Sequence, residues 1–381
     1  MSSAPDVVMY ADTFRSPELR HEVPLGIPDP FLYVEKDGRR HIMIGSMEIP
    51  RLAELGLFEL HPPEEFGYDE LLASGKTRFE ISEEVRLRAL RAFGVESAVV
   101  PLGFPLGVAD HLRANGIELT VDRDFFDDRR RVKAQHELEG IRRAQAAAEA
   151  GMTAARDLLR RAQPNGEVVH LDGDPLTSER LKLEIAQAFV AHGATADEFI
   201  VSHGPQASIG HEMGSGTIKP GETIVIDLWP RDNESFCYAD MTRTFVVGRP
   251  SDEAVEWHRL CKEALDRAIA DIRAGAAGKA IFDATCDIFE AAGYPTQRTK
   301  PAGETLADGF FHGLGHGVGL EVHEQPGMGL IAEKELKAGD VVTVEPGLYR
   351  PGVGGVRLED LVLVTENGAE NLTSFPYDLQ P

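Results

Sequence analysis

Three histidines lie within the glycine-rich segment FHGLGHGVGLEVHE, which runs from Phe311 to Glu324. The spacing of His312, His316 and His323 differs from the HExxH pattern of helical zinc sites. Each glycine would cost a helix about 1 kcal/mol relative to alanine, so we expect an extended segment. At about 3.3 Å per residue, His312 and His316 would then lie about 13 Å apart, too far for one metal ion to bind both. We therefore expect a single histidine ligand, with partners elsewhere in the chain.

Two strand-like segments resemble each other and supply acidic partners. In IKPGETIVID and LKAGDVVTVE, a turn glycine is followed six residues later by an acid at the end of a strand pattern, Asp227 and Glu345. Each acid is followed, thirteen or fourteen residues on, by a second acid that opens another strand pattern, Asp240 and Glu359. The chain thus carries the same unit twice. If the two copies pack about a pseudo-twofold axis, all four carboxylates converge near its centre.

Four neighbouring carboxylates disfavour one another's charged forms, and two divalent cations would balance their charge. With one imidazole added, the oxygen–nitrogen ligand set suits Mn²⁺ best, with Co²⁺, Fe²⁺ or Zn²⁺ as alternatives. Paired metal ions activate water and polarise a carbonyl group, which is the chemistry of amide hydrolysis. A single acid at a strand end is usually a turn residue or a surface ion pair, so the prediction depends on the matched spacing of the whole set.

The elements that must position these residues fall into two parts. Residues 1–132 are expected to form a small α/β domain, with a hairpin at Asp37-Gly38 and a helix that begins at Ser82 and ends at Gly94. A long helix then follows over residues 133–163. Its apolar residues recur at helical spacing and predict a face buried in the core: Leu138, Ile141, Ala144, Ala148, Met152, Ala155 and Leu159.

Residues 133–381 are expected to form the larger domain. Helices are predicted over 178–192, 252–273 and 280–292, with Ser178 and Ser251 as N-caps. Strands lie between and after them without regular βαβ alternation, which indicates an α+β fold.

Composition limits the classes of partner. The formal net charge of −24 argues against binding to nucleic acids or to an anionic membrane surface. The three cysteines show no CxxC spacing, so neither a disulfide framework nor a thiolate metal site is expected. The N-terminus lacks the features of a signal peptide, and no apolar run is long enough to cross a membrane. We expect a cytoplasmic protein.

At the four acids and the histidine segment, the sequence resembles the pita-bread metallopeptidase family, which includes creatinase, aminopeptidase P and prolidase. The resemblance covers about residues 133–381 and implies a pita-bread catalytic domain with a pseudo-twofold internal repeat. The preceding domain resembles the smaller creatinase-type N-terminal domain, and its presence favours the proline-directed branch. The resemblance implies a metal-dependent exopeptidase that cleaves the Xaa-Pro bond of short peptides, and it implies a homodimer.

The resemblance also implies roles for individual residues. Asp227 would bind one metal ion, while Asp240 and Glu359 would bridge both. His316 and Glu345 would bind the second ion, with Glu345 also transferring protons as general base and acid. The remaining positions would contact or steady the substrate: His211 in SIGHEMGSG, His312, His323 and Arg357. For Arg357, a surface ion pair is the competing interpretation.

One departure from the family pattern leaves the substrate open. The family has a short Asp-x-Gly hairpin after its first aspartate, whereas here Trp229-Pro230 follows Leu228 and the connection is longer. Extra residues in a hairpin loop are easily absorbed, but they can reshape a pocket. The alternatives are therefore a dipeptidase, an aminopeptidase, a two-metal hydrolase of another small amide, and a metal-free binding module of the same fold.

Overall fold

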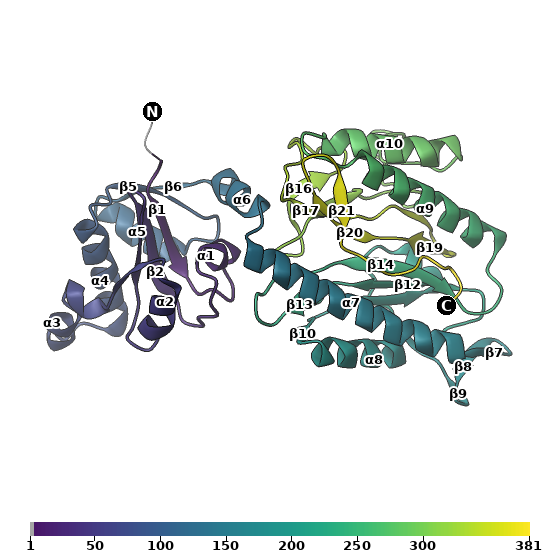
Figure 1. Ribbon diagram of the computed structural model, residues 1–381, viewed down its shortest axis with the longest axis horizontal. Helices are drawn as coiled ribbons and strands as arrows, with labels where there is room; N and C mark the ends of the chain where they lie inside the picture. Colours follow the sequence, from purple (N-terminus) through teal and green to yellow (C-terminus); the bar gives the residue numbers. More distant parts are fainter. Residues whose placement is uncertain (1–3) are drawn as a thin grey trace. The chain divides into compact units, whose positions relative to one another are not determined.

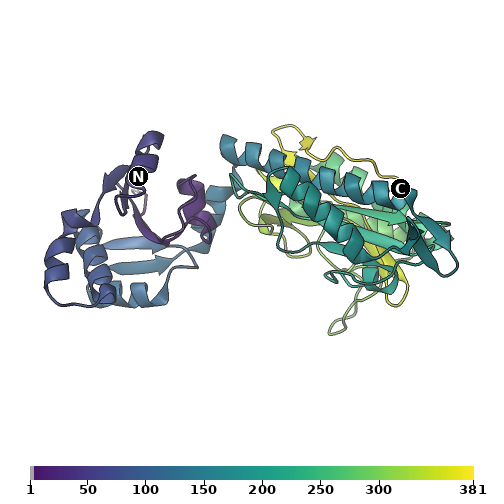
Figure 2. The same cartoon turned by 90° about the horizontal axis from the view of Figure 1, so that it is seen from below.

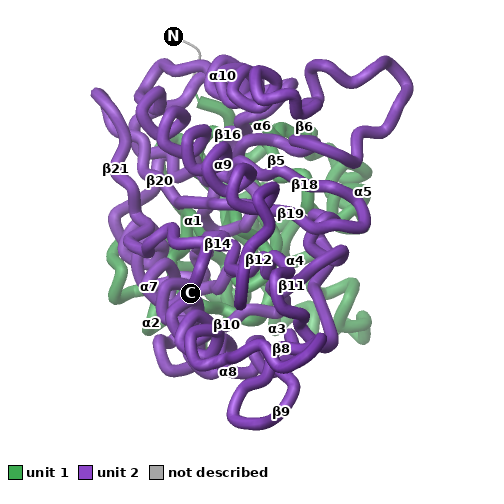
Figure 3. Tube along the Cα trace, turned by 90° about the vertical axis from the view of Figure 1, so that its right-hand side faces the viewer, with its two compact units in different colours: residues 1–130 green, residues 131–381 purple. Residues whose placement is uncertain are grey.

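The computed structural model describes residues 4–381, and the chain divides into two compact units, 1–130 and 131–381 (Figure 3). The division falls within helix α6 (Arg123–Arg131), two residues before the boundary expected from the sequence. Among the described residues, none of the helices combines the length and the apolar character needed to cross a bilayer.

Unit 1 is built on a six-stranded sheet with the strand order β4-β3-β2-β1-β5-β6. The chain turns from β2 into β3 at Asp37-Gly38, where both residues have positive φ, so the predicted hairpin is confirmed. Strand β4 lies at one edge of the sheet and runs parallel to β3. The strands are β1 (Val7–Ala11), β2 (Phe31–Lys36), β3 (Arg39–Met43), β4 (Glu59–His61), β5 (Ser97–Val100) and β6 (Glu118–Val121).

The helices of unit 1 cover this sheet (Figure 1). They are α1 (Pro17–Glu22), α2 (Ile49–Leu55), α3 (Tyr68–Ala73), α4 (Arg78–Ala92) and α5 (Leu106–Ala114), with a 3₁₀ turn at Pro63–Phe66. Helix α4 begins a turn earlier than predicted. Thr77 and Glu80 form a capping box, in which each side chain bonds the other's backbone N–H, so the expected cap at Ser82 is wrong.

Unit 2 holds the remaining elements. Its helices are α7 (Gln135–Arg161), α8 (Ser178–Ala191), α9 (Asp252–Asp271) and α10 (Gly278–Ala291), with a 3₁₀ turn at Gly204–Ser208. The strands that frame the site are β11 (Ile200–His203), β12 (Thr223–Leu228), β14 (Met241–Val246), β15 (Gly315–Gly317), β16 (Glu324–Met328), β17 (Val341–Val344), β18 (Gly347–Arg350), β19 (Gly354–Arg357) and β20 (Asp360–Val364). Shorter strands are β7 (Gln163–Asn165), β8 (Val168–Leu171), β9 (Asp174–Pro175), β10 (Ala194–Thr195), β13 (Arg231–Asp232) and β21 (Ala369–Asn371).

The strands of unit 2 lie between two pairs of helices, α7 with α8 on one side and α9 with α10 on the other (Figure 1). The turned view in Figure 2 shows α7 and α8 side by side. Each pair has its own core: α7 and α8 pack on β12 and β14, whereas α9 and α10 pack on β17 and β20. This is the repeated arrangement that the sequence predicted.

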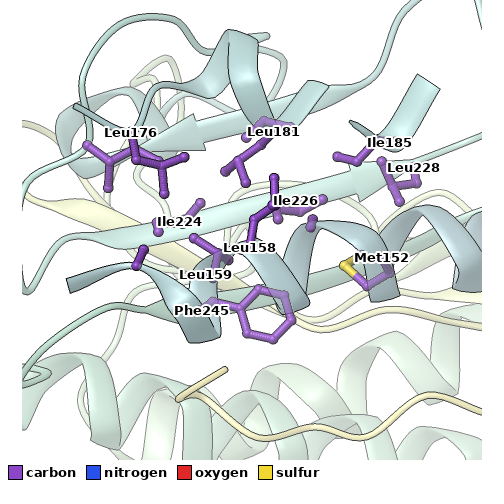
Figure 4. Packing of buried hydrophobic residues seen from close by; sticks show 14 of the residues in the cluster. Met152, Leu158, Leu159, Leu176, Leu181, Ile185, Ile224, Ile226, Leu228 and Phe245 are labelled. Atoms are coloured by element: carbon purple, nitrogen blue, oxygen red, sulfur yellow. The ribbon is translucent and has the colours of Figure 1, made fainter. Parts of the chain in front are cut away.

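The core beneath α7 and α8 buries the apolar face of α7. Met152 and Leu159 of α7 meet Leu181 and Ile185 of α8 and Ile226 of β12 (Figure 4). The predicted apolar face of α7 is confirmed, because all of its members are buried except Leu138, which is partly buried.

Helix caps and cysteines were predicted with mixed success. Ser251 caps α9 as expected, with its hydroxyl accepting from the backbone N–H of Ala254. Helix α8 is capped by Thr177, so the assignment of Ser178 as N-cap is wrong by one residue. The three cysteines are free and buried, in agreement with the sequence.

Candidate functional site

The two acid pairs occupy equivalent places in the two halves of unit 2. Asp227 lies near the end of β12, and Asp240 immediately precedes its antiparallel partner β14. Glu345 immediately follows β17, and Glu359 immediately precedes the partner strand β20. Because Val344 pairs with Asp360, Glu345 and Glu359 face each other across the strand pair. The repeat seen in the sequence thus places four carboxylates at corresponding strand ends.

The two halves are joined at this point by hydrogen bonds. The Thr242 hydroxyl on β14 donates to Oε2 of Glu359 at 2.7 Å, and the Glu359 backbone N–H donates to the Thr242 carbonyl at 3.0 Å. Two residues further along β14, the Thr244 hydroxyl donates to the carbonyl of Arg357 on β19 at 2.9 Å. These bonds bring the second acid of each half to the same place.

His316 is the histidine that lies among the acids. Its Nε2 is 3.4 Å from Oε1 of Glu345 and 3.8 Å from Oδ2 of Asp240. Its Nδ1 lies 3.1 Å from the carbonyl oxygen of Gly317 and is therefore the protonated nitrogen, which leaves the Nε2 lone pair facing the acids. Asp240, His316 and Glu359 offer ligand atoms that all lie within 4.8 Å of one another.

The alternating glycines are needed to bring His316 to this position. A Cβ atom on Gly315 would lie 2.0 Å from the carbonyl oxygen of Thr343 on β17, and one on Gly317 would lie 2.4 Å from that of Gln325 on β16. Strand β15 thus runs close between two other strands, where no side chain larger than hydrogen fits. The segment is extended here, as expected from its glycine content.

Arg357 neutralises part of the acidic cluster. Its Nη2 donates to Oδ2 of Asp227 at 2.5 Å, its Nη1 to the Tyr349 hydroxyl at 2.9 Å, and its Nε to the Thr242 hydroxyl at 3.2 Å. The side chain is only 6% exposed. The surface ion pair considered for Arg357 is therefore wrong, since the pair is buried.

His312 is held by both ring nitrogens. Its Nδ1 donates to the carbonyl of Gly313 at 2.7 Å, and its Nε2 lies 3.0 Å from the Tyr349 hydroxyl. Burial lowers the pKa of His312 to about 3, with the charge of Arg357 acting in the same direction, so the ring is neutral at neutral pH. In a neutral ring with Nδ1 protonated, Nε2 accepts from Tyr349.

Electrostatics show that the acidic cluster lacks positive charge. Burial, followed by the charges of the neighbouring carboxylates, raises the pKa of Asp240 and of Glu359 well above their usual values. Burial is also the main cause that raises the pKa of Glu345 to about 7. Burial lowers the pKa of His316 and of His323, so both imidazoles favour the neutral form that binds metals.

The residues fit a pair of divalent cations. Buried Oδ1 atoms of Asp227 and Asp240 have no hydrogen-bond partner among the described residues, although buried carboxylate oxygens are normally satisfied. Four carboxylates and one imidazole with its Nε2 turned inward provide hard oxygen ligands and one nitrogen ligand. Cations between them would satisfy the orphaned oxygens and balance the charge that raises the pKa values.

All nine residues singled out from the sequence line one cavity of about 980 Å³. They are His211, Asp227, Asp240, His312, His316, His323, Glu345, Arg357 and Glu359. The cavity wall also contains apolar residues that the sequence did not indicate: Ile209, Met213, Phe311 and Val322. Trp229, which departs from the family pattern, is part of the same wall. Sequence reasoning also missed Tyr349, because a buried tyrosine on a short strand gives no local signal.

The repeated strand pairs, their helix layers and the acidic cluster define a hydrolase of the pita-bread class with a divalent-metal centre. The model of metallopeptidase family M24 matches residues 139–366. The chain is 34% identical over 257 residues to a Xaa-Pro dipeptidase of Pyrococcus furiosus, covering 67% of each chain. The chain belongs to metallopeptidase family M24.

Solved structures show the same fold along nearly the whole chain. A Xaa-Pro dipeptidase from Bacillus anthracis superimposes with a TM-score of 0.79 at 22% identity, covering 99% of this chain and 94% of that one. An X-Pro aminopeptidase from Thermotoga maritima gives a TM-score of 0.78 at 22% identity, covering 98% of this chain and 97% of that one. The α+β pita-bread fold predicted from the sequence is confirmed.

Proposed function

We propose that this chain is a two-metal exopeptidase that hydrolyses the amide bond between an N-terminal residue and a following proline. The observation that carries the proposal is the convergence of four carboxylates and one inward-facing imidazole from two repeated strand pairs on one cavity. Membership of a metallopeptidase family and likeness to a Xaa-Pro dipeptidase support the reaction and the substrate class.

In this proposal Asp227, Asp240, His316, Glu345 and Glu359 would hold the metal ions. Mn²⁺ is the proposed metal, ahead of Co²⁺, Fe²⁺ and Zn²⁺, because carboxylate oxygens dominate the ligand set. When bound, such an ion pair supplies Lewis-acid polarisation of the scissile carbonyl and activation of the attacking water.

Glu345 is the proposed proton carrier. Its carboxylate lines the cavity beside His316, which places it next to the water that the site would activate. In this role it takes a proton from the attacking water and returns it to the leaving proline nitrogen. Its Oε1 faces His316 at 3.4 Å, and its Oε2 lies 3.9 Å from Nδ1 of His312.

Three histidines are proposed to handle the substrate. His211 and His323 line the cavity wall and would position the peptide. His312 would steady the tetrahedral intermediate, which requires Nε2 to be protonated so that it donates to a substrate oxygen in place of accepting from the Tyr349 hydroxyl. Arg357 has all three of its nitrogens bonded to protein atoms, so we favour charge balance at Asp227 over direct contact with a substrate carboxylate.

Three wider features belong to the proposal. Unit 1 would be a creatinase-type N-terminal domain, the chain would form a homodimer, and the enzyme would act in the cytoplasm. The fold supports dipeptidase and aminopeptidase activity equally, since structures named for each match with nearly the same TM-score. Trp229 in the cavity wall supports one second candidate, the hydrolysis of another small amide.

The test is an assay of Mn²⁺-reconstituted protein with an Xaa-Pro dipeptide, an Xaa-Pro-Xaa tripeptide and a matched Xaa-Ala dipeptide. Release of the N-terminal residue from the proline substrates alone would support the proposal. Cleavage of the dipeptide alone would indicate a dipeptidase, whereas preference for the tripeptide would indicate an aminopeptidase. If the metal-loaded protein cleaves neither proline substrate, the proposed substrate class is wrong, and hydrolysis of another small amide is favoured.

A further inference from the structure

A second group of metal-binding residue types lies in unit 1, at the edge of its sheet. His41 on β3 pairs with Glu59 on the edge strand β4, and His61 lies two residues further along β4. Because side chains two residues apart point to the same face of a strand, Glu59 and His61 both face the side on which His41 lies. The three residues offer ligand atoms within 4.8 Å of one another.

Two of the three distances between ligand atoms match those that one tetrahedral ion requires. Nδ1 of His41 lies 3.2 Å from Nε2 of His61 and 3.4 Å from Oε2 of Glu59. A tetrahedral zinc ion bound at about 2.0–2.1 Å separates neighbouring ligand atoms by about 3.3–3.4 Å. The other oxygen of Glu59 lies 3.6 Å from Nη1 of Arg39, so Oε2 is the one turned to the histidines.

The rings are also oriented as metal-bound histidines usually are. Nδ1 of His61 lies 2.8 Å from Oε2 of Glu65, which marks this nitrogen as the protonated one and leaves Nε2 as a lone-pair donor. A carboxylate behind a ligating imidazole is the usual support for a metal-bound histidine. His41 is held by stacking on Phe93, with ring centroids 4.5 Å apart and planes at 17°.

The site is accessible to an ion from solvent. The His41 side chain is almost buried, at 11% exposure, whereas Glu59 is 48% exposed and His61 is 20% exposed. A wall of aromatic rings surrounds the histidines, with Phe93 against both of them and Phe66 against His61. Three protein ligands with one side open leave a fourth position for water.

We propose that His41, Glu59 and His61 bind one zinc ion, separate from the acidic cluster of unit 2, with Glu65 supporting His61. The ion would tie the edge strand β4 to β3, since each strand supplies at least one ligand. Imidazole and carboxylate ligands in tetrahedral geometry suit Zn²⁺. The competing interpretation is a hydrogen bond between two neutral imidazoles that binds no metal.

Zinc binding by the full-length chain tests this proposal. The Asp240→Asn/Glu359→Gln double variant serves as the parent, because it weakens the cluster in unit 2. After equilibrium dialysis against Zn²⁺, elemental analysis counts the zinc bound per chain. His61→Ala is expected to bind about one equivalent of zinc less than the parent. Glu65→Gln is expected to lower the affinity for that zinc ion by about 10–100-fold.

Two further variants make the result decisive. Glu59→Gln changes an exposed side chain, so it tests the same equivalent without risk to folding. His111→Ala removes a histidine of unit 1 that lies 3.7 Å from Glu83, and its zinc count should equal that of the parent. Equal zinc binding by the parent, His61→Ala and Glu59→Gln would overturn the proposal. In the otherwise unmodified chain, His61→Ala should leave Mn²⁺-dependent turnover unchanged.

Discussion

Replacement of Arg357 by methionine tests whether this arginine balances the charge of the acidic cluster. Methionine keeps much of the volume but leaves Asp227 without its partner, and the pair is buried, with side chains 6% and 12% exposed. Removing one member of a buried ion pair costs about 3–5 kcal/mol. At about 2–4 °C per kcal/mol for a unit of this size, the metal-free variant should unfold roughly 6–20 °C lower than the metal-free unmodified chain, which is the parent in this comparison.

Metal ions should offset part of this loss. Unit charges about 6 Å apart interact by about 3 kcal/mol at an effective dielectric constant of about 20, so Arg357 weakens the binding of cations nearby. We expect Arg357→Met to bind Mn²⁺ at least about tenfold more tightly than the parent, which adds about 1.4 kcal/mol to metal stabilisation. Differential scanning calorimetry with and without Mn²⁺ measures the increment directly.

Arg131→Met is the matched control. Arg131 forms a buried bidentate pair with Asp340, at 3.0 and 2.6 Å, in the same unit but outside the cavity. Its loss should lower the unfolding temperature by a similar amount in the metal-free protein, with the Mn²⁺ increment unchanged from the parent. Arg259→Met, which removes an exposed ion pair on α9, should change neither the unfolding temperature nor the Mn²⁺ increment by much. If Arg357→Met and Arg131→Met show the same Mn²⁺ increment, the charge-balance argument is refuted.

The remaining predictions concern the ligands, the proton-handling residues and the packing of the site. Asp240→Asn should lower both bound Mn²⁺ and kcat/KM by well over about 100-fold, because changes behind the ligands alone cost about 10–100-fold; full activity would contradict its place in the site. Tyr349→Phe should lower kcat by about tenfold with metal content unchanged, since the hydroxyl lies 2.9 Å from Nη1 of Arg357 and 3.0 Å from Nε2 of His312 and holds both side chains in place before substrate binds, and an unchanged kcat would show that neither bond matters. Gly315→Ala should abolish metal binding, because its Cβ would lie 2.0 Å from a β17 carbonyl oxygen, and a stable, metal-loaded variant would refute the argument from close packing. In the metal-free chain, the raised pKa values of Asp240 and Glu359 mean that the native state holds protons the unfolded state has released, so stability should fall as pH rises from about 4. Thermal unfolding at pH 5.5 and 7.5 measures this slope, which Mn²⁺ should remove at pH 7.5; a metal-free protein that is more stable at the higher pH would contradict the assignment.

The sequence predicted the convergence of the four acids because its main signal is a repeat. Matched distances from the turn glycines to Asp227 and Glu345, and then to the second acids, reflect two strand pairs that are both antiparallel. Such spacing can be read directly from the sequence, so the convergence of the acids could be inferred without a structure. The glycines around His316 were also informative, since they predicted an extended segment; the structure adds that two of them lie where strands approach closely.

Other features depend on contacts between distant segments and leave no local pattern. Tyr349 links Arg357 to His312 only because β18 and β19 pair and bring the side chains of Tyr349 and Arg357 together. The burial of Arg357 follows from the contact of β19 with β14, which joins the two halves. The true start of α4 could have been found in the sequence, since Thr77 and Glu80 stand at capping-box spacing. The sequence pattern favoured Ser82 as the cap because it lies closer to the apolar residues of the helix.

The hydrogen bonds from Thr242 to Glu359 and from Thr244 to Arg357 join the two repeats, and the site exists only where they are joined. Each half contributes two of the acids, and neither half contains the whole ligand set. Any motion that slides β14 away from β19 and β20 would separate the ligands before either half loses its own core. Loss of bound metal should therefore be an early sign that β14 has separated from β19 and β20. For the same reason, amide hydrogen exchange of β14 and β20 should slow together when metal is bound.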